Sequence, residues 1–86
     1  MMQERARMER IKIVVTLAGS LNKYFQGEKV RAISMPAKAV AGDLLQQLSL
    51  PRESISFVAV NGVKASLEQA LQEGDKVKVY PPVSGG

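Results

Sequence analysis

Residues 76–86 read KVKVYPPVSGG, a strand-like alternation that runs into two prolines and finishes on two glycines. Valine and lysine alternate over 76–80, and this period of two residues predicts a strand with one buried face. The two prolines exclude a helix after this strand and favour an extended backbone. We therefore expect a last strand over 76–80 and an extended tail over 81–86.

Four earlier segments have the β-branched composition of strands. They are RIKIVVTLAG, VRAISM, Phe57–Val60 and Val63–Ala65. The first alternates apolar and polar side chains, and the second follows it after a polar connection. The third and fourth are joined by Asn61-Gly62, the pair typical of a two-residue type I′ turn. The sequence therefore predicts two hairpins before the last strand.

One segment changes to the period of a helix. In AVAGDLLQQLSL, the apolar residues from Ala41 to Leu48 fall at positions i, i+3, i+4 and i+7, which is one face of a helix. Gly42 weakens the first turn by about 1 kcal/mol relative to alanine. No serine, threonine, aspartate or asparagine lies where the N-cap belongs. The sequence thus predicts the helix more firmly than the residue at which it begins.

Two connecting segments carry local signals. GSLNKYFQGEK contains two glycines and an asparagine, which favour a turn or loop. SLEQAL has the pattern of a capping box, with Ser66 as the cap and Gln69 three residues later. We expect a short helix or 3-10 turn there.

The predicted order is two strands, a helix, two strands, a short helix and a last strand. This order is typical of an α+β roll, with a mixed sheet of four to five strands, one main helix and a short 3-10 helix. If the first and last strands pair in parallel at the centre, the connection between them crosses over the helix. We expect one domain over 11–80, between a flexible N-terminal extension over 1–10 and the tail.

The composition argues against an enzyme. The 86 residues include no cysteine and no histidine, so the chain has no thiolate nucleophile, no sulfur ligand for zinc and no imidazole base. No apolar run approaches the length of a membrane span, and the charged N-terminus does not resemble a secretory signal. We expect a cytoplasmic protein with no membrane association and no bound cofactor or metal.

The net charge of +4 suggests another class of partner. Basic side chains dominate residues 11–40, and such a patch attracts nucleic acid. Single-strand binding also needs stacking aromatics, and the chain has only two tyrosines and two phenylalanines. A solvated basic face or an acidic protein partner is the favoured interpretation, and a nucleic-acid-binding module is the alternative.

The order of elements and the terminal Gly-Gly resemble the ubiquitin-like β-grasp sulfur carriers. The resemblance covers roughly residues 11–86 and is closest to the small subunit of molybdopterin synthase. It rests on IKIVVTLA as the first strand, VAGDLLQQL as the helix, VAVNGV as the hairpin and LQEGDKVKVYPPVSGG as the close. The β-grasp fold is what this resemblance implies.

The resemblance also implies a chemistry at the C-terminus. A ubiquitin-activating-type adenylating enzyme would use ATP to convert the Gly86 carboxylate to an acyl-adenylate. Sulfur would then replace AMP to give a thiocarboxylate, which the molybdopterin synthase large subunit would use. Six extended residues reach roughly 19 Å, enough to enter a buried site. The implied catalytic residues are Gly85 and Gly86, and the implied partner-binding residues are Tyr80, Pro81, Pro82, Val83 and Ser84.

Three alternatives remain at the level of sequence. The chain could serve the thiamine pathway instead, or could be a modifier joined to lysines through Gly86, or the tail could be an unselected loose end. Carriers of the molybdopterin type usually present bulky apolar residues where this chain has Thr16 and Lys64. Polar residues there would weaken a hydrophobic docking surface, which bears on the identity of the partner.

Overall fold

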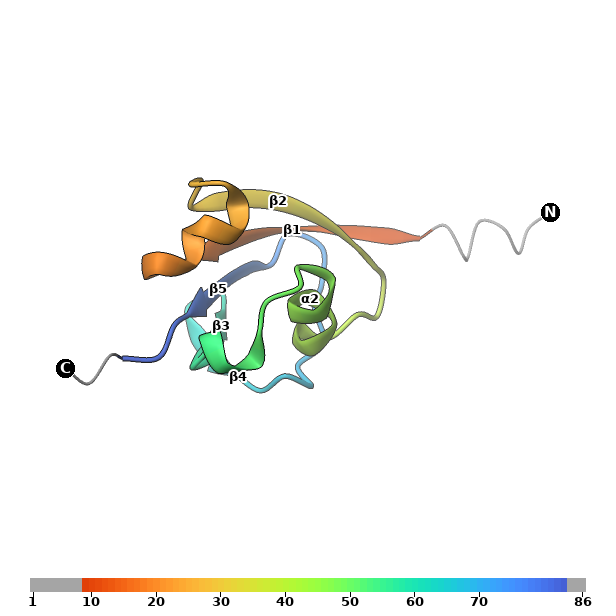
Figure 1. Cartoon of the computed structure of the whole chain (residues 1–86). Coiled ribbons are helices and arrows are strands. Elements are labelled where there is room, and N and C mark those ends of the chain that lie inside the picture. Colours follow the sequence, from red (N-terminus) through yellow and green to blue (C-terminus); the bar gives the residue numbers. More distant parts are fainter. Residues whose placement is uncertain (1–8, 84–86) are drawn as a thin grey trace.

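The computed structural model describes residues 9–83 and contains a five-stranded sheet in the order β2-β1-β5-β3-β4 (Figure 1). The strands are β1 (Arg10–Leu17), β2 (Val30–Pro36), β3 (Phe57–Val60), β4 (Val63–Ala65) and β5 (Lys76–Tyr80). All five strand segments expected from the sequence are present. The sheet is mixed and carries its helix on one face, so the α+β β-grasp prediction is confirmed.

The centre of the sheet is the parallel pair formed by the first and last strands. Val15 lies opposite Val77, and Leu17 lies opposite Val79, all four with at most 1% of their surface exposed. β1 also pairs antiparallel with β2, and β5 pairs antiparallel with β3. The predicted parallel crossover is therefore confirmed. Because β5 has neighbours on both edges, the tail begins at the middle of the sheet.

Helix α2 (Ala41–Gln47) lies across one face of the sheet and closes the core. Ala41, Leu44 and Leu45 are buried against the inward side chains of the strands. The predicted helix face is thus confirmed. The largest fully buried side chains are Phe25, Ile13, Leu17, Met35, Leu44, Val15, Val58, Val77 and Val79.

The start of α2 is stabilised by backbone from a distant segment. The N–H groups of Ala41 and Gly42 donate to the carbonyls of Gln69 and Leu67, at 2.9 and 2.8 Å. The Asp43 carboxylate accepts the Val40 N–H at 2.9 Å. These bonds satisfy donors that a helix N-terminus leaves free, so α2 begins without a Ser, Thr, Asp or Asn cap.

Of the short helix or 3-10 turn expected over residues 66–71, the structure has the turn and no helix. Ser66 Oγ accepts the Glu68 N–H at 3.2 Å, and the Ser66 carbonyl accepts the Gln69 N–H at 3.1 Å, which makes a single turn. The chain then runs extended past α2, with an isolated bridge between Val40 and Ala70. A helix would need for itself the carbonyls that the start of α2 uses, so the long-range bonds replace it.

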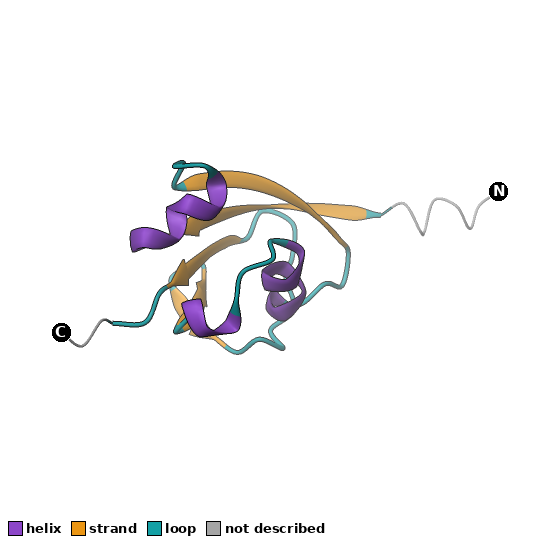
Figure 2. Cartoon of the chain, viewed as in Figure 1, coloured by secondary structure: helices purple, strands orange, loops and turns teal. Residues whose placement is uncertain are grey.

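The segment predicted as a loop after β1 is instead a 3-10 helix, η1 (Gly19–Phe25). Leu21 and Phe25 are buried and anchor it to the core. The Arg31 side chain donates to the Phe25 carbonyl at 3.1 Å and lies over its ring. A second short 3-10 helix, η2 (Arg52–Ser54), precedes β3. Figure 2 shows η1 at the end of the sheet from which the C-terminal segment leaves.

The domain boundaries stay a prediction in part. Residues 1–8 of the expected extension lie outside the described residues, and so do Ser84, Gly85 and Gly86 of the expected tail. The strands and helices found within 9–83 all fall between Arg10 and Tyr80.

Candidate functional site

The candidate site begins where β5 gives way to the tail. The Val79 carbonyl accepts the Ala18 N–H at 2.9 Å, and the Tyr80 carbonyl accepts the Ser56 N–H at 2.7 Å. Beyond these two bonds, no hydrogen bond from residues 81–83 is found within residues 9–83. Two prolines follow, and neither has an N–H to continue the ladder. The sheet therefore holds the chain up to Tyr80 and releases it at Pro81.

Gly19 positions the base of the tail. It has a φ of +58°, and a Cβ built on it would lie 3.2 Å from the Pro81 Cγ. A side chain at residue 19 would therefore crowd the first proline, and glycine adopts this positive φ with less strain than other residues. Reasoning from the sequence missed Gly19, because its contact with Pro81 joins residues far apart in the chain.

The predicted partner-binding residues become progressively more exposed along the tail. Tyr80 and Pro81 are half-buried, Pro82 is exposed and Val83 has 91% of its surface exposed. Exposed apolar groups beyond the sheet are available to a partner. Ser84, Gly85 and Gly86 lie outside the described residues, so the catalytic and distal tail predictions stay predictions.

Tyr80 lies on the sheet face opposite α2. Its ring stacks on that of Phe57, with centroids 4.4 Å apart and planes 11° from parallel. The two residues are direct cross-strand neighbours, and cross-strand aromatic pairs stabilise sheets. Tyr80 is therefore part of a surface rather than of the core. The pattern KVKVY predicts that Tyr80 points outward, but no local pattern identifies Phe57 as its partner.

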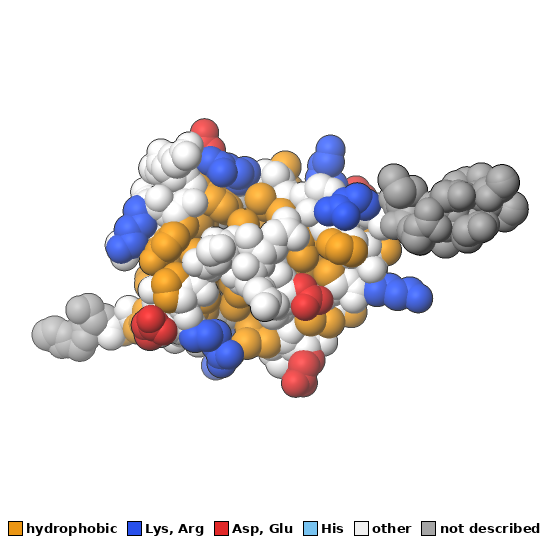
Figure 3. Space-filling model, turned by 45° about the vertical axis from the view of Figure 1, so that its right-hand side comes forward, with side chains coloured by type: hydrophobic (Ala, Val, Ile, Leu, Met, Phe, Trp, Pro, Cys, Tyr) orange, Lys and Arg blue, Asp and Glu red, His pale blue; other side chains and the backbone are white. Residues whose placement is uncertain are grey.

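The two polar departures from the family pattern lie on this same face. Thr16 is half-buried and pairs in register with Lys78, and Lys64 is exposed and pairs with Ala59. In the view of Figure 3, acidic and basic side chains are both scattered around hydrophobic patches. The charged strand residues on the face opposite α2 are Arg10, Lys12, Lys64, Lys76 and Lys78, whereas Arg31 pairs with the buried Val15 and lies on the α2 side.

Two further properties of the described residues concern metal ions and membranes. Within 9–83 there is no group of three or more histidine, cysteine, aspartate or glutamate residues that could hold a metal ion. In that same range no helix has the length and apolar character needed to cross a membrane. The site consists of a tail, its glycine support and the adjoining sheet face.

Comparisons with known proteins point the same way. The model of the ThiS family matches residues 15–86. No curated protein matches the sequence. A putative molybdopterin converting factor subunit 1 from Pyrococcus furiosus has a similar structure, with a TM-score of 0.72 and 25% identity over 85% of this chain and 99% of that one.

Two other solved structures are also similar. SAMP1 from Haloferax volcanii, a small archaeal modifier protein, has a TM-score of 0.72 and 26% identity, over 87% of this chain and 99% of that one. A chain from the complex of subunits 1 and 2 of the molybdopterin-converting factor of Helicobacter pylori has a TM-score of 0.60 and 21% identity. The match covers 88% of this chain and 100% of that one. The last similarity, at its low identity, supports the fold alone.

Proposed function

This chain belongs to the ThiS family, and on that premise we propose that it is a sulfur carrier for molybdopterin biosynthesis. In this proposal the chain catalyses nothing itself. Its Gly86 carboxylate is the reacting group, and partner proteins supply the chemistry. Those partners are an ATP-dependent adenylating enzyme of the ubiquitin-activating type and the large subunit of molybdopterin synthase.

The proposed reaction has two steps at the Gly86 carboxyl group, the first at its oxygen and the second at its carbon. The Gly86 carboxylate attacks the α-phosphate of ATP, which releases pyrophosphate and leaves an acyl-adenylate. A sulfur nucleophile then attacks the acyl carbon, AMP leaves, and the carboxylate oxygen is replaced by sulfur. The sulfur is thus carried on the C-terminus, so the chain needs no cysteine to perform this role.

The observation that carries the proposal is the release of the chain from the sheet at Pro81. The chain is hydrogen-bonded through Tyr80 and then makes no further hydrogen bond within the described residues. Pro81 and Pro82 favour extended geometry, which would carry the segment beyond them away from the domain. The match of the family model runs through this segment to residue 86. A tail so built fits entry into a partner's active site.

Intact-mass spectrometry tests the proposal. The chain is incubated with the adenylating enzyme of its own organism, ATP and a sulfide source. The expected result is a mass gain equal to the difference between sulfur and oxygen, mapped by fragmentation to Gly86. A variant that lacks Gly86 should show no gain, and the exposed-surface variant Glu68→Ala should show the full gain.

The choice of pathway needs a second readout. Loaded protein is added to the molybdopterin synthase large subunit and its precursor, and formation of the dithiolene product is followed. Product formation supports the molybdopterin role. Loading without product, together with sulfur transfer in a thiazole-forming system, would assign the chain to the thiamine pathway.

A second candidate is a protein modifier joined to lysines through Gly86. It is favoured by the similarity to SAMP1 of Haloferax volcanii, at 26% identity over nearly the whole of both chains. Tagged chain expressed in its own host distinguishes the two roles. A ladder of conjugates that disappears on deletion of Gly86 supports the modifier, and a single free species supports the carrier.

A further inference from the structure

We propose that Asn61 is a site of spontaneous deamidation, and that the Asp75 carboxylate protects it in the folded chain by holding its side-chain amide. This inference goes beyond the proposed function and does not depend on it. It concerns the junction between the β3–β4 turn and the start of β5, at the end of β5 opposite to the tail.

An asparagine that precedes a glycine can lose its amide group without an enzyme. The backbone nitrogen of the glycine attacks the side-chain carbonyl carbon and closes a five-membered imide ring. The bond from that carbon to Nδ2 breaks, and ammonia leaves with the proton that the glycine nitrogen gives up. Water then opens the imide to give aspartate or isoaspartate. Glycine favours ring closure because it has no Cβ to obstruct the approach of its backbone.

Asn61 is the residue of this chain that meets the chemical requirement. The sequence has two asparagines, and of these Asn61 precedes Gly62 whereas Asn22 precedes Lys23. Both Asn61 and Gly62 are exposed. A Cβ built on Gly62 would meet nothing within 4 Å, so no neighbouring group obstructs the ring. The turn therefore offers the reactive pair in an open position.

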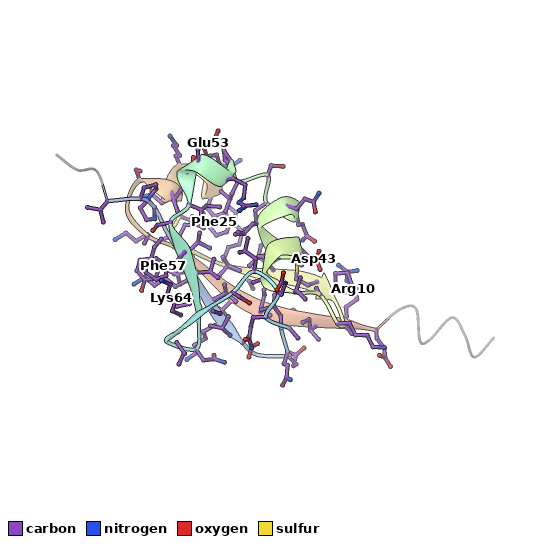
Figure 4. All side chains as sticks on the ribbon, turned by 90° about the horizontal axis from the view of Figure 1, so that it is seen from below. Arg10, Phe25, Asp43, Glu53, Phe57 and Lys64 are labelled. Carbon is purple, nitrogen blue, oxygen red and sulfur yellow. The ribbon has the colours of Figure 1, made fainter. Side chains whose placement is uncertain are left out.

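Water, the second reactant, also has access to the turn. A hollow of about 290 Å³ lies beside it, and Asn61 and Asp75 both line this hollow. Lys64 of β4, which is labelled in Figure 4, lines it as well. Because Asn61 and Lys64 are exposed, the hollow is open to solvent. Hydrolysis of an imide at residue 61 therefore meets no barrier of access.

In the folded chain, the Asn61 amide is engaged at both of its polar atoms. Its Nδ2 donates to Asp75 Oδ1 at 3.0 Å, and its Oδ1 accepts the Lys76 N–H at 2.9 Å. The carboxylate only accepts and the backbone N–H only donates, so these partners fix the orientation of the amide. The Asn61 N–H also donates to the Lys76 carbonyl at 2.7 Å. We call the two side-chain bonds the clamp.

The clamp holds the amide on the side of β3 away from the attacking nitrogen. In the sheet order β5-β3-β4, Asp75 and Lys76 lie at the start of the strand on one side of β3. Gly62 leads instead to β4, on the other side. The amide must leave both partners and turn toward Gly62 before the ring closes. Deamidation therefore requires a local opening in which the clamp breaks.

Asp75 is itself held in position. Its Oδ2 accepts the Gln72 N–H at 2.9 Å, and its own N–H donates to the Gln72 carbonyl at 3.0 Å. Its carbonyl accepts the Val14 N–H at 2.9 Å. Because the carboxylate is already ordered, its bond to Asn61 costs little further side-chain entropy. Its charge also makes it a stronger acceptor than a neutral group. Removal of this carboxylate should therefore release the amide.

Substitution of Asp75 with a matched control tests the proposal. We compare the wild-type full chain with Asp75→Ala, Asp75→Asn and the control Glu73→Ala. Asp75→Asn keeps a neutral acceptor oxygen at the same position. Glu73 belongs to the same turn, and its carboxylate accepts the Lys12 N–H at 2.9 Å. The control therefore removes the same charge and a similar bond, but leaves the clamp in place.

Each protein is aged in mildly alkaline buffer, once folded and once unfolded in guanidinium chloride. Peptide mapping by mass spectrometry follows the conversion of amide to acid at residue 61, and fragmentation separates aspartate from isoaspartate. Residue 22 serves as the internal reference in every sample. The ratio of the folded to the unfolded rate within one variant removes any effect of the substitution on the intrinsic reactivity of the pair.

The wild type should deamidate at residue 61 at least about tenfold more slowly when folded than in guanidinium chloride. Asp75→Ala should raise the folded rate at least about threefold, because an exposed bond to a charged acceptor is lost. The rate of Asp75→Asn should lie between those of Asp75→Ala and the wild type. Glu73→Ala should leave the rate unchanged, and residue 22 should keep its amide in all folded samples.

Three results would overturn the proposal. Equal rates for the folded and unfolded wild type would show that the fold gives no protection. Equal acceleration by Asp75→Ala and Glu73→Ala would show a general loosening of the turn instead of a clamp. An intact amide at residue 61 in guanidinium chloride would show that the pair is unreactive. If circular dichroism shows that Asp75→Ala is unfolded, Asp75→Asn decides, and a rate equal to that of Glu73→Ala would then overturn the clamp.

Discussion

Gly19 lies against the first proline of the tail, and a Cβ at this position would crowd the proline ring. Two separate features favour glycine here. One is its φ of +58°, and the other is the distance of 3.2 Å that would separate a Cβ at this position from Pro81 Cγ. The first concerns the backbone of η1, and the second concerns the direction of the tail. A substitution therefore affects stability and tail geometry together, and a control is needed to separate them.

We predict that Gly19→Ala lowers the free energy of unfolding by about 1 kcal/mol or more and also slows loading of Gly86. Urea denaturation measures the first effect, and the rate of thiocarboxylate formation measures the second. Gly27→Ala is the matched control, because Gly27 also has a positive φ, +93°, but a Cβ there meets nothing within 4 Å. Its loading rate should match the wild type, and equal slowing in both variants would contradict the positioning role.

For single residues, the sequence predicts the conformation or orientation correctly where it depends on neighbouring residues in the chain. The pair Asn61-Gly62 predicts a type I′ turn, and both residues have positive φ, at 52° and 86°. The alternation over 76–80 predicts that Tyr80 points away from the core, and it does. Gly19, by contrast, reads only as a turn residue, because the proline that it supports lies more than sixty positions later.

The helices and strands could likewise be predicted where they depend on local sequence, and not where they depend on distant segments. The strands and the buried face of α2 could be predicted, because their periods depend on which side chains face the core. The start of α2 and the absence of a helix over 66–71 could not, because each depends on hydrogen bonds between these two segments. Likewise, η1 depends on the burial of Leu21 and Phe25, which is a tertiary effect. The glycines and asparagine of this segment predicted a turn or loop instead.

Gly42 lies where the start of α2 contacts the segment after β4, and this contact limits which residues fit at position 42. Helix propensity alone predicts that Gly42→Ala gains up to about 1 kcal/mol. A Cβ at this position would lie 3.2 Å from the Leu67 carbonyl oxygen, which also accepts the Gly42 N–H at 2.8 Å. The oxygen cannot retreat without lengthening that bond. We therefore expect the steric cost to exceed the propensity gain.

We predict that Gly42→Ala lowers the free energy of unfolding by about 1 kcal/mol, through this overpacking. Urea denaturation gives the change, and amide hydrogen exchange at residue 42 should accelerate. Gln46→Ala, at an exposed position of the same helix, should change stability by less than about 0.5 kcal/mol. A gain in stability for Gly42→Ala would show that propensity outweighs the contact.

For the whole molecule, the domain and the tail divide the work of recognition. In the proposed function, the tail supplies the reacting group and the folded domain supplies contact area for the partner. We predict that a synthetic peptide of residues 81–86 is a poor substrate for the adenylating enzyme, because it lacks the contacts of the folded domain. Pyrophosphate exchange at equal concentrations should be at least about tenfold slower for the peptide than for the full chain. Equal rates would mean that the domain contributes nothing to recognition.

The central position of β5 has a mechanical consequence. A partner that draws the tail inward pulls along a strand that is bonded to β1 on one edge and to β3 on the other. Pulled along its axis, this strand loads its hydrogen bonds in shear, so they share the force instead of opening one by one. In single-molecule extension, pulling β1 and β5 apart by their outer ends should need more force than pulling the β3–β4 hairpin open. The tail can thus be put under tension while the domain that carries it stays folded.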